Sequence, residues 1–174
     1  RHILGSIGAT LVVAAIWYLG GPFQKREVPI LMYHHIGPTR SDMWTVSRTD
    51  FEVQMQQLKA NGYETIVPSD LVDYAHRRGR LPPKPVILTF DDGSLSVKDV
   101  ARPILRRHGF RAVVYLATGA VTAPPSDRGM VDGHPCLTWP EVRQLREEGT
   151  FVFGGHTRHH DRAVFAADAT NDIE

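Results

Sequence analysis

Residues 86–94 read VILTFDDGS, a run of strand-forming residues that ends in two adjacent carboxylates and a glycine. Aliphatic and aromatic residues of this kind favour strands, whereas Asp and Gly favour the turns that follow them. We therefore expect a strand over Val86–Phe90, with Asp91 and Asp92 directly past its end. Because α/β folds hold their active groups where strands end, this acidic pair is a candidate functional site.

Further strand candidates lie on both sides of this stretch, and helix candidates separate them. The other expected strands are Val28–Tyr33, Tyr63–Val67, Ala112–Leu116 and Phe151–Phe153. Strands that alternate with helices indicate a mostly parallel sheet with helices outside it. The sequence therefore predicts an α/β fold, either a doubly wound sheet or a barrel.

Four amphipathic segments are the expected helices. The stretches Thr49–Glu52 and Thr138–Glu141 both fit the capping-box pattern that begins a helix. Ser69 is a candidate cap for another helix, and Pro103 is expected to make a further one irregular. The expected helices run over residues 50–61, 69–78, 97–108 and 139–148. The segment Gly119–Leu137, rich in proline and glycine, is expected to be a long irregular loop.

Composition narrows the classes of function. The chain has 174 residues, of which 42% are hydrophobic and 22% charged, and its formal net charge is +1. This composition is typical of one folded domain, and the charge is too small for the basic surface on which nucleic-acid binding usually depends. Cys136 is the single cysteine, which excludes a disulfide within the chain.

The N-terminal segment is apolar. Ile3–Phe23 contains 21 residues without a charge, which is long enough for a helix to cross the roughly 30 Å hydrocarbon core of a membrane. Trp17 and Tyr18 near its end are typical of the membrane interface. We expect an uncleaved membrane helix; a cleaved signal peptide and a buried core helix are the alternatives. The expected organisation is an anchor or signal segment with its linker over residues 1–27, and a globular domain over residues 28–174.

A second polar cluster follows the last expected strand. The sequence GGHTRHH places His156 and His160 four residues apart, past Phe153. Two imidazoles and one carboxylate can hold a divalent ion and leave a position open for water, and a second carboxylate could then take a proton from that water. Alternatively, Asp-Asp-Gly is only a turn or a cap, and the histidines share a solvated helix face.

Other polar residues allow structural and functional interpretations. His34 and His35 follow the first strand, where they would contact substrate or serve structure, and His134 in the long loop is a weaker candidate. Ser94 and Ser96 are expected to cap the next helix, because no nucleophile elbow surrounds them.

The two clusters together carry a resemblance to a known family. LTFDDGS followed by HTRHH resembles the two leading signatures of the polysaccharide deacetylases, the carbohydrate esterases with a NodB-like domain. The flanking segments VPILMYHHIG, FEVQMQQLKANGYETI, ILRRHGFRAVVYLATGAV and LTWPEVRQLREEG are similar to the branch that deacetylates N-acetylglucosamine polymers. The resemblance covers about residues 28–160.

This resemblance implies a division of labour between the residues of the two clusters. Asp91 matches the family's general base, and Asp92, His156 and His160 match its metal ligands. The implied metal is Zn²⁺, with Co²⁺ or Ni²⁺ as alternatives. Thr157 occupies a Ser/Thr position whose hydroxyl stabilises the loop.

The implied fold and reaction follow from the same resemblance. The fold would be an incomplete, distorted (β/α) barrel with fewer than eight strands, preceded by the membrane helix. The reaction would be hydrolysis of acetamide groups on an N-acetylglucosamine polysaccharide, either an exopolysaccharide or peptidoglycan. The implied location is the cell membrane, with the catalytic domain in the periplasm or at the cell surface, or secreted if the N-terminal segment is cleaved.

The resemblance stops at the C-terminal end. Fourteen residues follow His160, and they lack the family's later signatures, which include a late histidine proposed as general acid. We therefore expect that the C-terminal part of the domain is missing. Two other functions stay open: a catalytically silent relative that binds glycan or an export complex, and a hydrolase of another ester or amide.

Overall fold

The central sheet is parallel, as the sequence predicts. The computed structural model of the chain describes residues 27–158, so the expected membrane helix and His160 lie outside the described residues. The sheet has the order β1-β5-β6-β9, and β4 pairs with the start of β5. The strands are β1 (Ile30–Tyr33), β4 (Glu64–Thr65), β5 (Pro85–Phe90), β6 (Ala112–Leu116) and β9 (Phe151–Gly155).

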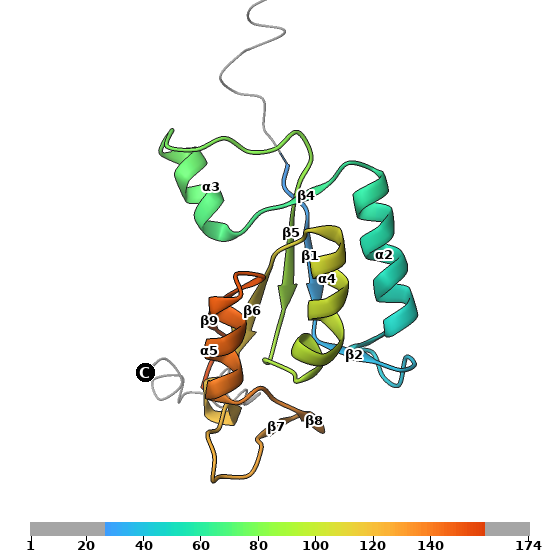
Figure 1. Cartoon of the computed structure of the whole chain (residues 1–174), viewed down its shortest axis with the longest axis vertical. Helices are drawn as coiled ribbons and strands as arrows, with labels where there is room; N and C mark the ends of the chain where they lie inside the picture. The colour runs from blue at the N-terminus through green and yellow to red at the C-terminus, as the bar shows by residue number, and fades with distance from the viewer. Residues whose placement is uncertain (1–26, 159–174) are drawn as a thin grey trace, which may run out of the picture.

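Three helices cover one face of this sheet (Figure 1). They are α2 (Arg48–Ala60), α4 (Arg102–His108) and α5 (Trp139–Glu147). The α2 side chains Phe51 and Met55 pack with Leu88 and Phe90 of β5 in the main core. A π-helical turn, η1 (Val97–Ala101), leads into α4 directly before the irregularity predicted at Pro103.

A smaller cluster lies on the opposite face of the sheet. It contains Ile87 of β5 and Val113 of β6, with Val67 at the start of α3 (Pro68–Ala75). Every residue of β5 is buried, because successive side chains enter the two clusters in turn. The α/β prediction is therefore confirmed, while over residues 27–158 the sheet is open and does not close into a barrel. In this same range, no helix is long and apolar enough to cross a membrane.

The predicted caps of α2 and α3 were wrong. Helix α2 begins after Ser47, whose hydroxyl accepts a hydrogen bond from the Asp50 amide (3.0 Å), two residues earlier than the predicted cap. Helix α3 begins at Pro68, and its Asp70 carboxylate accepts from the Val67 amide (2.8 Å), so Ser69 is not the cap. The capping box Thr138–Glu141 before α5 is confirmed.

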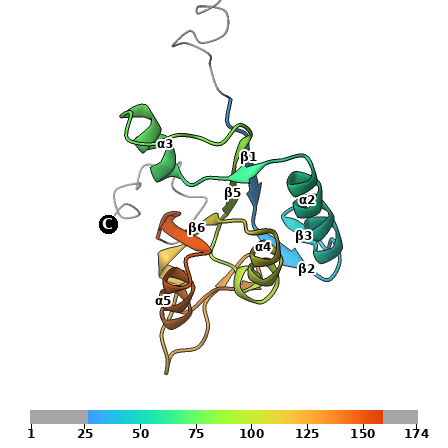
Figure 2. The ribbon, with the colours of Figure 1, turned by 45° about the horizontal axis from the view of Figure 1, so that its top comes forward.

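Two short strand pairs interrupt the expected loops. The strands β2 (His35–Gly37) and β3 (Thr45–Ser47) lie beside α2 (Figure 2). The strands β7 (Met130–Val131) and β8 (His134–Pro135) form a hairpin inside the long loop. Its two-residue turn is Asp-Gly with positive φ at both positions, 48° and 81°, as expected for a tight hairpin. Both pairs lie at the end of the sheet to which β1 and β5 point (Figure 1).

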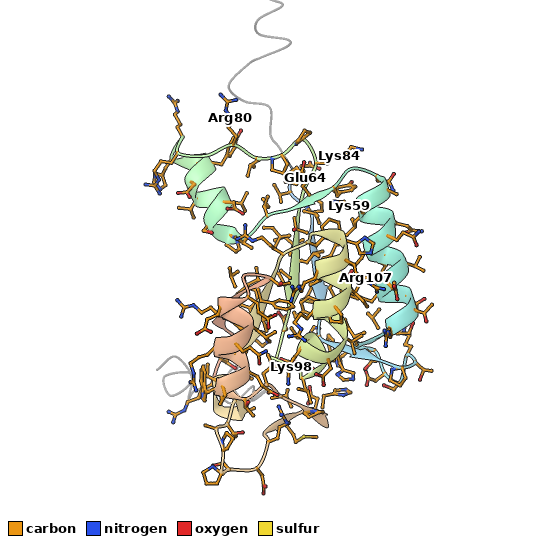
Figure 3. All side chains as sticks on the ribbon, in the orientation of Figure 1. Lys59, Glu64, Arg80, Lys84, Lys98 and Arg107 are labelled. Carbon is orange, nitrogen blue, oxygen red and sulfur yellow. The ribbon has the colours of Figure 1, made fainter. Side chains whose placement is uncertain are left out.

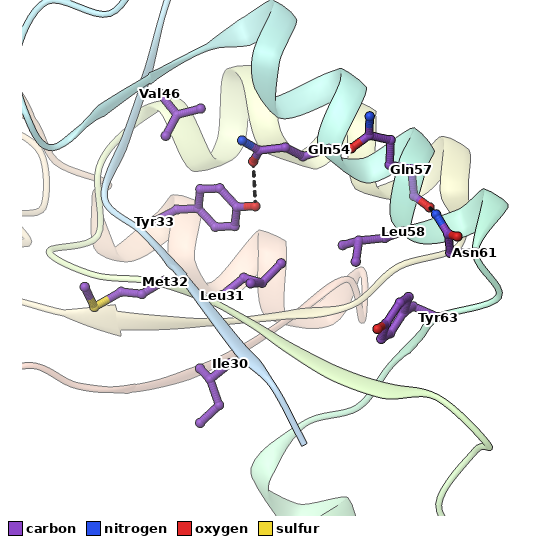
Figure 4. A pocket seen from close by; sticks show the side chains of 10 residues that line it. All are labelled: Ile30, Leu31, Met32, Tyr33, Val46, Gln54, Gln57, Leu58, Asn61 and Tyr63. Carbon is purple, nitrogen blue, oxygen red and sulfur yellow. Dashed lines mark hydrogen bonds between the residues drawn. The ribbon is translucent and has the colours of Figure 1, made fainter. Parts of the chain in front are cut away.

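A broad groove lies between β1 and α2 (Figure 4). Tyr33 reaches across it and donates a hydrogen bond to Gln54 Oε1 (2.8 Å), and burial raises the pKa of Tyr33 to about 12. Aliphatic, amide and tyrosine side chains line this groove, and no carboxylate or imidazole does. Metal-dependent hydrolysis needs such groups, so the candidate site must lie elsewhere.

Candidate metal and catalytic site

The carboxylate pair lies in a sharp, buried turn at the end of β5. The Asp91 amide donates to the Tyr33 carbonyl (2.8 Å), which extends the pairing of β1 with β5 by one residue. Asp92 and Gly93 then adopt positive φ angles of 68° and 74°. Asp tolerates this left-handed conformation better than most residues. The reversal leaves Asp91 only 8% exposed and Asp92 only 9% exposed.

This turn is held from two sides. The Gly93 carbonyl accepts from the Leu137 amide (2.8 Å), and the Leu95 amide donates to the Pro135 carbonyl (2.7 Å). A Cβ atom at Gly93 would lie 2.7 Å from Leu116 Cδ2, closer than carbon atoms pack. Glycine is therefore required here for two reasons, its positive φ and its close contact with β6. We call residues 91–96 the carboxylate turn.

His156 approaches the same turn from β9. Its amide donates to the Leu116 carbonyl (2.8 Å), and its Nε2 lies 3.6 Å from Asp92 Oδ1. The prediction that parallel strands bring the two clusters to one edge is thus confirmed for Asp92 and His156. The His156 side chain is 35% exposed, so this half of the site is open to solvent. His160, the other predicted ligand, lies outside the described residues.

The distance between these two groups fits a shared metal ion. Two ligands at ordinary Zn–N and Zn–O distances in a tetrahedral site lie about 3.4 Å apart, close to the separation of His156 and Asp92. Residues 27–158 contain no group of three potential ligands by themselves. The described donors therefore provide two of the three predicted ligands, with Asp91 beside them in sequence and in the turn.

His34 also lies at the site. Its Nε2 is 4.0 Å from Asp91 Oδ2, and its ring packs on that of Trp44 with a centroid distance of 4.7 Å. From the sequence, His34 is predicted either to contact substrate or to have a structural role. Its position directly after β1, the neighbour of β5, was the signal that it would meet the carboxylate pair.

His35 and His134 form a stacked pair that the sequence did not predict. Their ring centroids are 3.9 Å apart and the planes differ by 19°. His35 Nδ1 lies 2.9 Å from Ser94 Oγ, and His134 Nε2 lies 3.4 Å from Asp42 Oδ2. Burial and, secondly, the neighbouring His134 lower the pKa of His35. The pair connects the loop before β3 to the β7–β8 hairpin, which places His134 closer to the site than expected.

The serines of the carboxylate turn serve structure in a different way from the one predicted. Ser96 Oγ accepts from the Ile36 amide (3.0 Å), and its own amide donates to Ser94 Oγ (3.2 Å). Ser96 makes no side-chain cap on the following helix. Both hydroxyls instead connect the carboxylate turn to β2. Ser94 and Ser96 are buried, and buried polar groups require hydrogen-bond partners.

An ion-pair network fastens the long loop to α5. Arg128 donates to both Glu141 carboxylate oxygens (2.7 and 3.1 Å) and to the Cys136 carbonyl (2.7 Å). Lys98 of η1, labelled in Figure 3, donates to Glu141 Oε1 (2.9 Å). Burial alone would raise the pKa of Glu141, but the hydrogen bonds from Arg128 and Lys98 outweigh it and hold that pKa well below its usual range.

A small cleft opens over Asp92. Its lining residues include His34 and Trp44, and Asp132 and His134 of the hairpin. The cleft contains the predicted metal ligand together with aromatic and polar groups. This combination is typical of a small-molecule site.

Comparison with known proteins identifies the family. Residues 78–173, more than half of the chain, match the family model described as polysaccharide deacetylase. The protein YxkH of Bacillus subtilis is 33% identical over 135 residues, covering 77% of this chain and 43% of the relative. The poly-beta-1,6-N-acetyl-D-glucosamine N-deacetylase of Escherichia coli K12 is 29% identical over 161 residues, covering 87% of this chain and 24% of the relative. The chain thus spans less than half the length of these two relatives.

Solved structures show the same arrangement of elements. IcaB from Ammonifex degensii matches with a TM-score of 0.68 and 28% identity, over 86% of this chain and 60% of that one. The deacetylase PplD of Streptococcus pyogenes, solved in complex with acetate, matches with a TM-score of 0.66 and 26% identity, over 82% of this chain and 61% of that one.

Proposed function

Because the chain belongs to the polysaccharide deacetylase family, we propose that it supplies a metal-dependent site that hydrolyses acetamide groups on an N-acetylglucosamine polysaccharide. The observation that carries the proposal is the approach of His156 Nε2 to Asp92 Oδ1 (3.6 Å) beside the buried Asp91. The substrate class is supported by relatives whose names describe deacetylation of poly-N-acetylglucosamine.

In this proposal Asp92, His156 and His160 hold the metal. Carboxylate oxygen and imidazole nitrogen together suit Zn²⁺ first, and Co²⁺ or Ni²⁺ in its place. A divalent ion bound there supplies polarisation of the acetamide carbonyl and acidification of water. Asp91 is next to this site without being one of its proposed ligands, and the proposal gives its carboxylate the role of base.

The chain's own residues then move the protons. Asp91 accepts a proton from the water that attacks the carbonyl carbon. The C–N bond breaks, acetate leaves, and the sugar nitrogen takes up a proton to leave as a free amine. In this proposal His34, whose Nε2 lies 4.0 Å from Asp91 Oδ2, gives that proton.

A further part of the proposal concerns residues outside 27–158. Ile3–Phe23 would anchor the protein in the cell membrane with the catalytic domain in the periplasm or at the cell surface. A chain from which residues up to Phe23 are deleted should no longer sediment with membranes. Continued sedimentation with membranes would argue against the anchor.

The function is tested by acetate release from an N-acetylglucosamine oligomer with Zn²⁺ or Co²⁺ added. We expect the full chain to release acetate and Asp91→Asn to release none, with the same amount of metal bound to both. Metal binding without acetate release by the full chain would favour a silent, glycan-binding relative. Release of acetate from simple esters but not from the oligomer would favour a hydrolase of another substrate.

A further inference from the structure

Trp44 is a large aromatic side chain that stays partly in solvent at the mouth of the cleft over Asp92. Its side chain lines this cleft, yet the residue is 40% exposed. The His34 ring packs against the Trp44 ring, with a centroid distance of 4.7 Å. An aromatic ring held next to catalytic groups and still in contact with water is available to a ligand.

The backbone holds Trp44 in this position. Its amide donates to Asp42 Oδ1 (2.8 Å), and its carbonyl accepts from the His35 amide (3.3 Å). Hydrogen bonds of the Asp42 carboxylate, first with Thr45 and also with the Trp44 backbone, lower the pKa of Asp42 to about 2. Asp42 is therefore charged at neutral pH, and the turn that carries Trp44 is fixed before any ligand arrives.

Polar residues of the hairpin line the same cleft, and the hairpin is joined to the turn that carries Trp44. His134 of the hairpin lies 3.4 Å from Asp42 and stacks on His35, so the hairpin and the Trp44 loop are connected. Asp132, at the hairpin turn, is also a lining residue. The cleft thus combines the aromatic ring of Trp44, the carboxylate of Asp132 and the predicted metal ligand Asp92.

We propose that Trp44 stacks on the pyranose ring of the sugar whose acetamide is bound beside Asp91 and Asp92. A pyranose presents an apolar face of C–H groups and a rim of hydroxyls, which suits a cleft lined by an aromatic ring and by a carboxylate that accepts hydrogen bonds. Trp44 is then a specificity-determining residue, because an acetylated compound without a sugar ring gains nothing from it. This inference rests on the proposed function and names the group that recognises its substrate.

The test measures binding of an N-acetylglucosamine tetramer to the full chain by calorimetry, without added metal. Trp44→Ala and Trp44→Leu should raise Kd about tenfold, and Trp44→Phe should raise it less, because Leu keeps apolar volume but only Phe keeps a flat ring. Met43→Ala is the matched control: Met43 is its exposed apolar neighbour on the same loop but does not line this cleft. Met43→Ala should bind as wild type does.

The two proposals fail in different ways. Binding that is equal in wild type, Trp44→Ala and Trp44→Leu would overturn the stacking role, even if acetate release is normal. Conversely, Trp44-dependent binding by a chain that releases no acetate with metal would uphold the stacking role while the deacetylase proposal fails. A tetramer affinity that falls equally in Met43→Ala and Trp44→Ala would show disturbance of the loop and would also overturn the specific role of Trp44. Equal melting temperatures for the variants would establish that each is folded.

Discussion

The two halves of the candidate site are built very differently. The carboxylate turn follows the fully buried β5 and is held by hydrogen bonds from Leu137 and to Pro135, with both acidic residues less than a tenth exposed. His156 follows β9, which pairs only with β6 in the described sheet, and its side chain is 35% exposed. The difference teaches that the core fixes the proposed base and one proposed ligand, whereas the proposed imidazole ligand is open to solvent.

The largest expected effect concerns Asp91, the proposed base, in the carboxylate turn. Asp91→Asn keeps the size of the side chain but removes its ability to accept a proton, so turnover should fall by about 10² to 10⁴-fold. Steady-state acetate release, measured with metal bound in both proteins, provides the test. Turnover within a few-fold of wild type would remove Asp91 from the role of base.

The next largest effect is a difference in unfolding free energy between glycine substitutions in the two halves of the site. Gly93→Ala places a Cβ atom 2.7 Å from Leu116 Cδ2 at a φ of 74°, so it should cost about 2 kcal/mol or more of unfolding free energy. Gly155→Ala is the matched change beside His156, where a Cβ atom meets nothing within 4 Å. Its unfolding free energy should stay within about 1 kcal/mol of wild type. Urea titration of both variants checks the comparison, and equal losses would contradict it.

A smaller effect should come from the ion-pair network of Arg128, Glu141 and Lys98, which fastens the long loop to α5. Glu141→Gln should lower the unfolding free energy near pH 7 by about 1–3 kcal/mol, because Arg128 and Lys98 lose a charged partner. The pKa of Glu141 is lower in the folded state than its ordinary value of 4.5. Its contribution is therefore complete above about pH 4.5 and is lost as the pH falls further toward the folded pKa.

Unfolding followed from pH 7 down to pH 3 tests this network directly. Wild type should lose stability over the acid range partly through Glu141, and Glu141→Gln should lack that part of the loss. Parallel curves for the two proteins would mean that Glu141 carries no acid-sensitive stability.

The smallest effect reports on the packing behind the carboxylate turn. Burial raises the pKa of the Cys136 thiol to about 11, and its Sγ lies 3.8 Å from the Asp92 carbonyl. Labelling by a thiol reagent at pH 8 should therefore be slow in the folded chain and fast in urea, since the thiolate is the reactive form. Fast labelling of the folded chain would show that this half opens readily.

Sequence reasoning predicted the elements whose signals are local and repeated. The strand Val86–Phe90, the capping box Thr138–Glu141 and the irregularity at Pro103 were all confirmed. The starts of α2 and α3 were misplaced because several residues near each start could cap, and tertiary packing selected Ser47 and Asp70 over their neighbours.

The site was predicted as far as strand order allows. Asp92 and His156 meet because each follows a strand of one parallel sheet, and that could be read from the pattern. The position of His134 could not be predicted from the sequence, because it depends on how a long loop folds back. His134 there stacks on His35 and lies beside Asp42. His160 and the predicted membrane helix lie outside the described residues and stay predictions.

Metal binding by four full-length proteins tests most directly the claim that the two adjacent aspartates have separate tasks. Calorimetric titration with Zn²⁺ should give one ion per chain for wild type and for Asp91→Asn. Asp92→Ala and His156→Ala should lose that binding. Equal loss of the ion in Asp91→Asn and Asp92→Ala would contradict the division between base and ligand, and unchanged binding in Asp92→Ala would contradict the metal site itself.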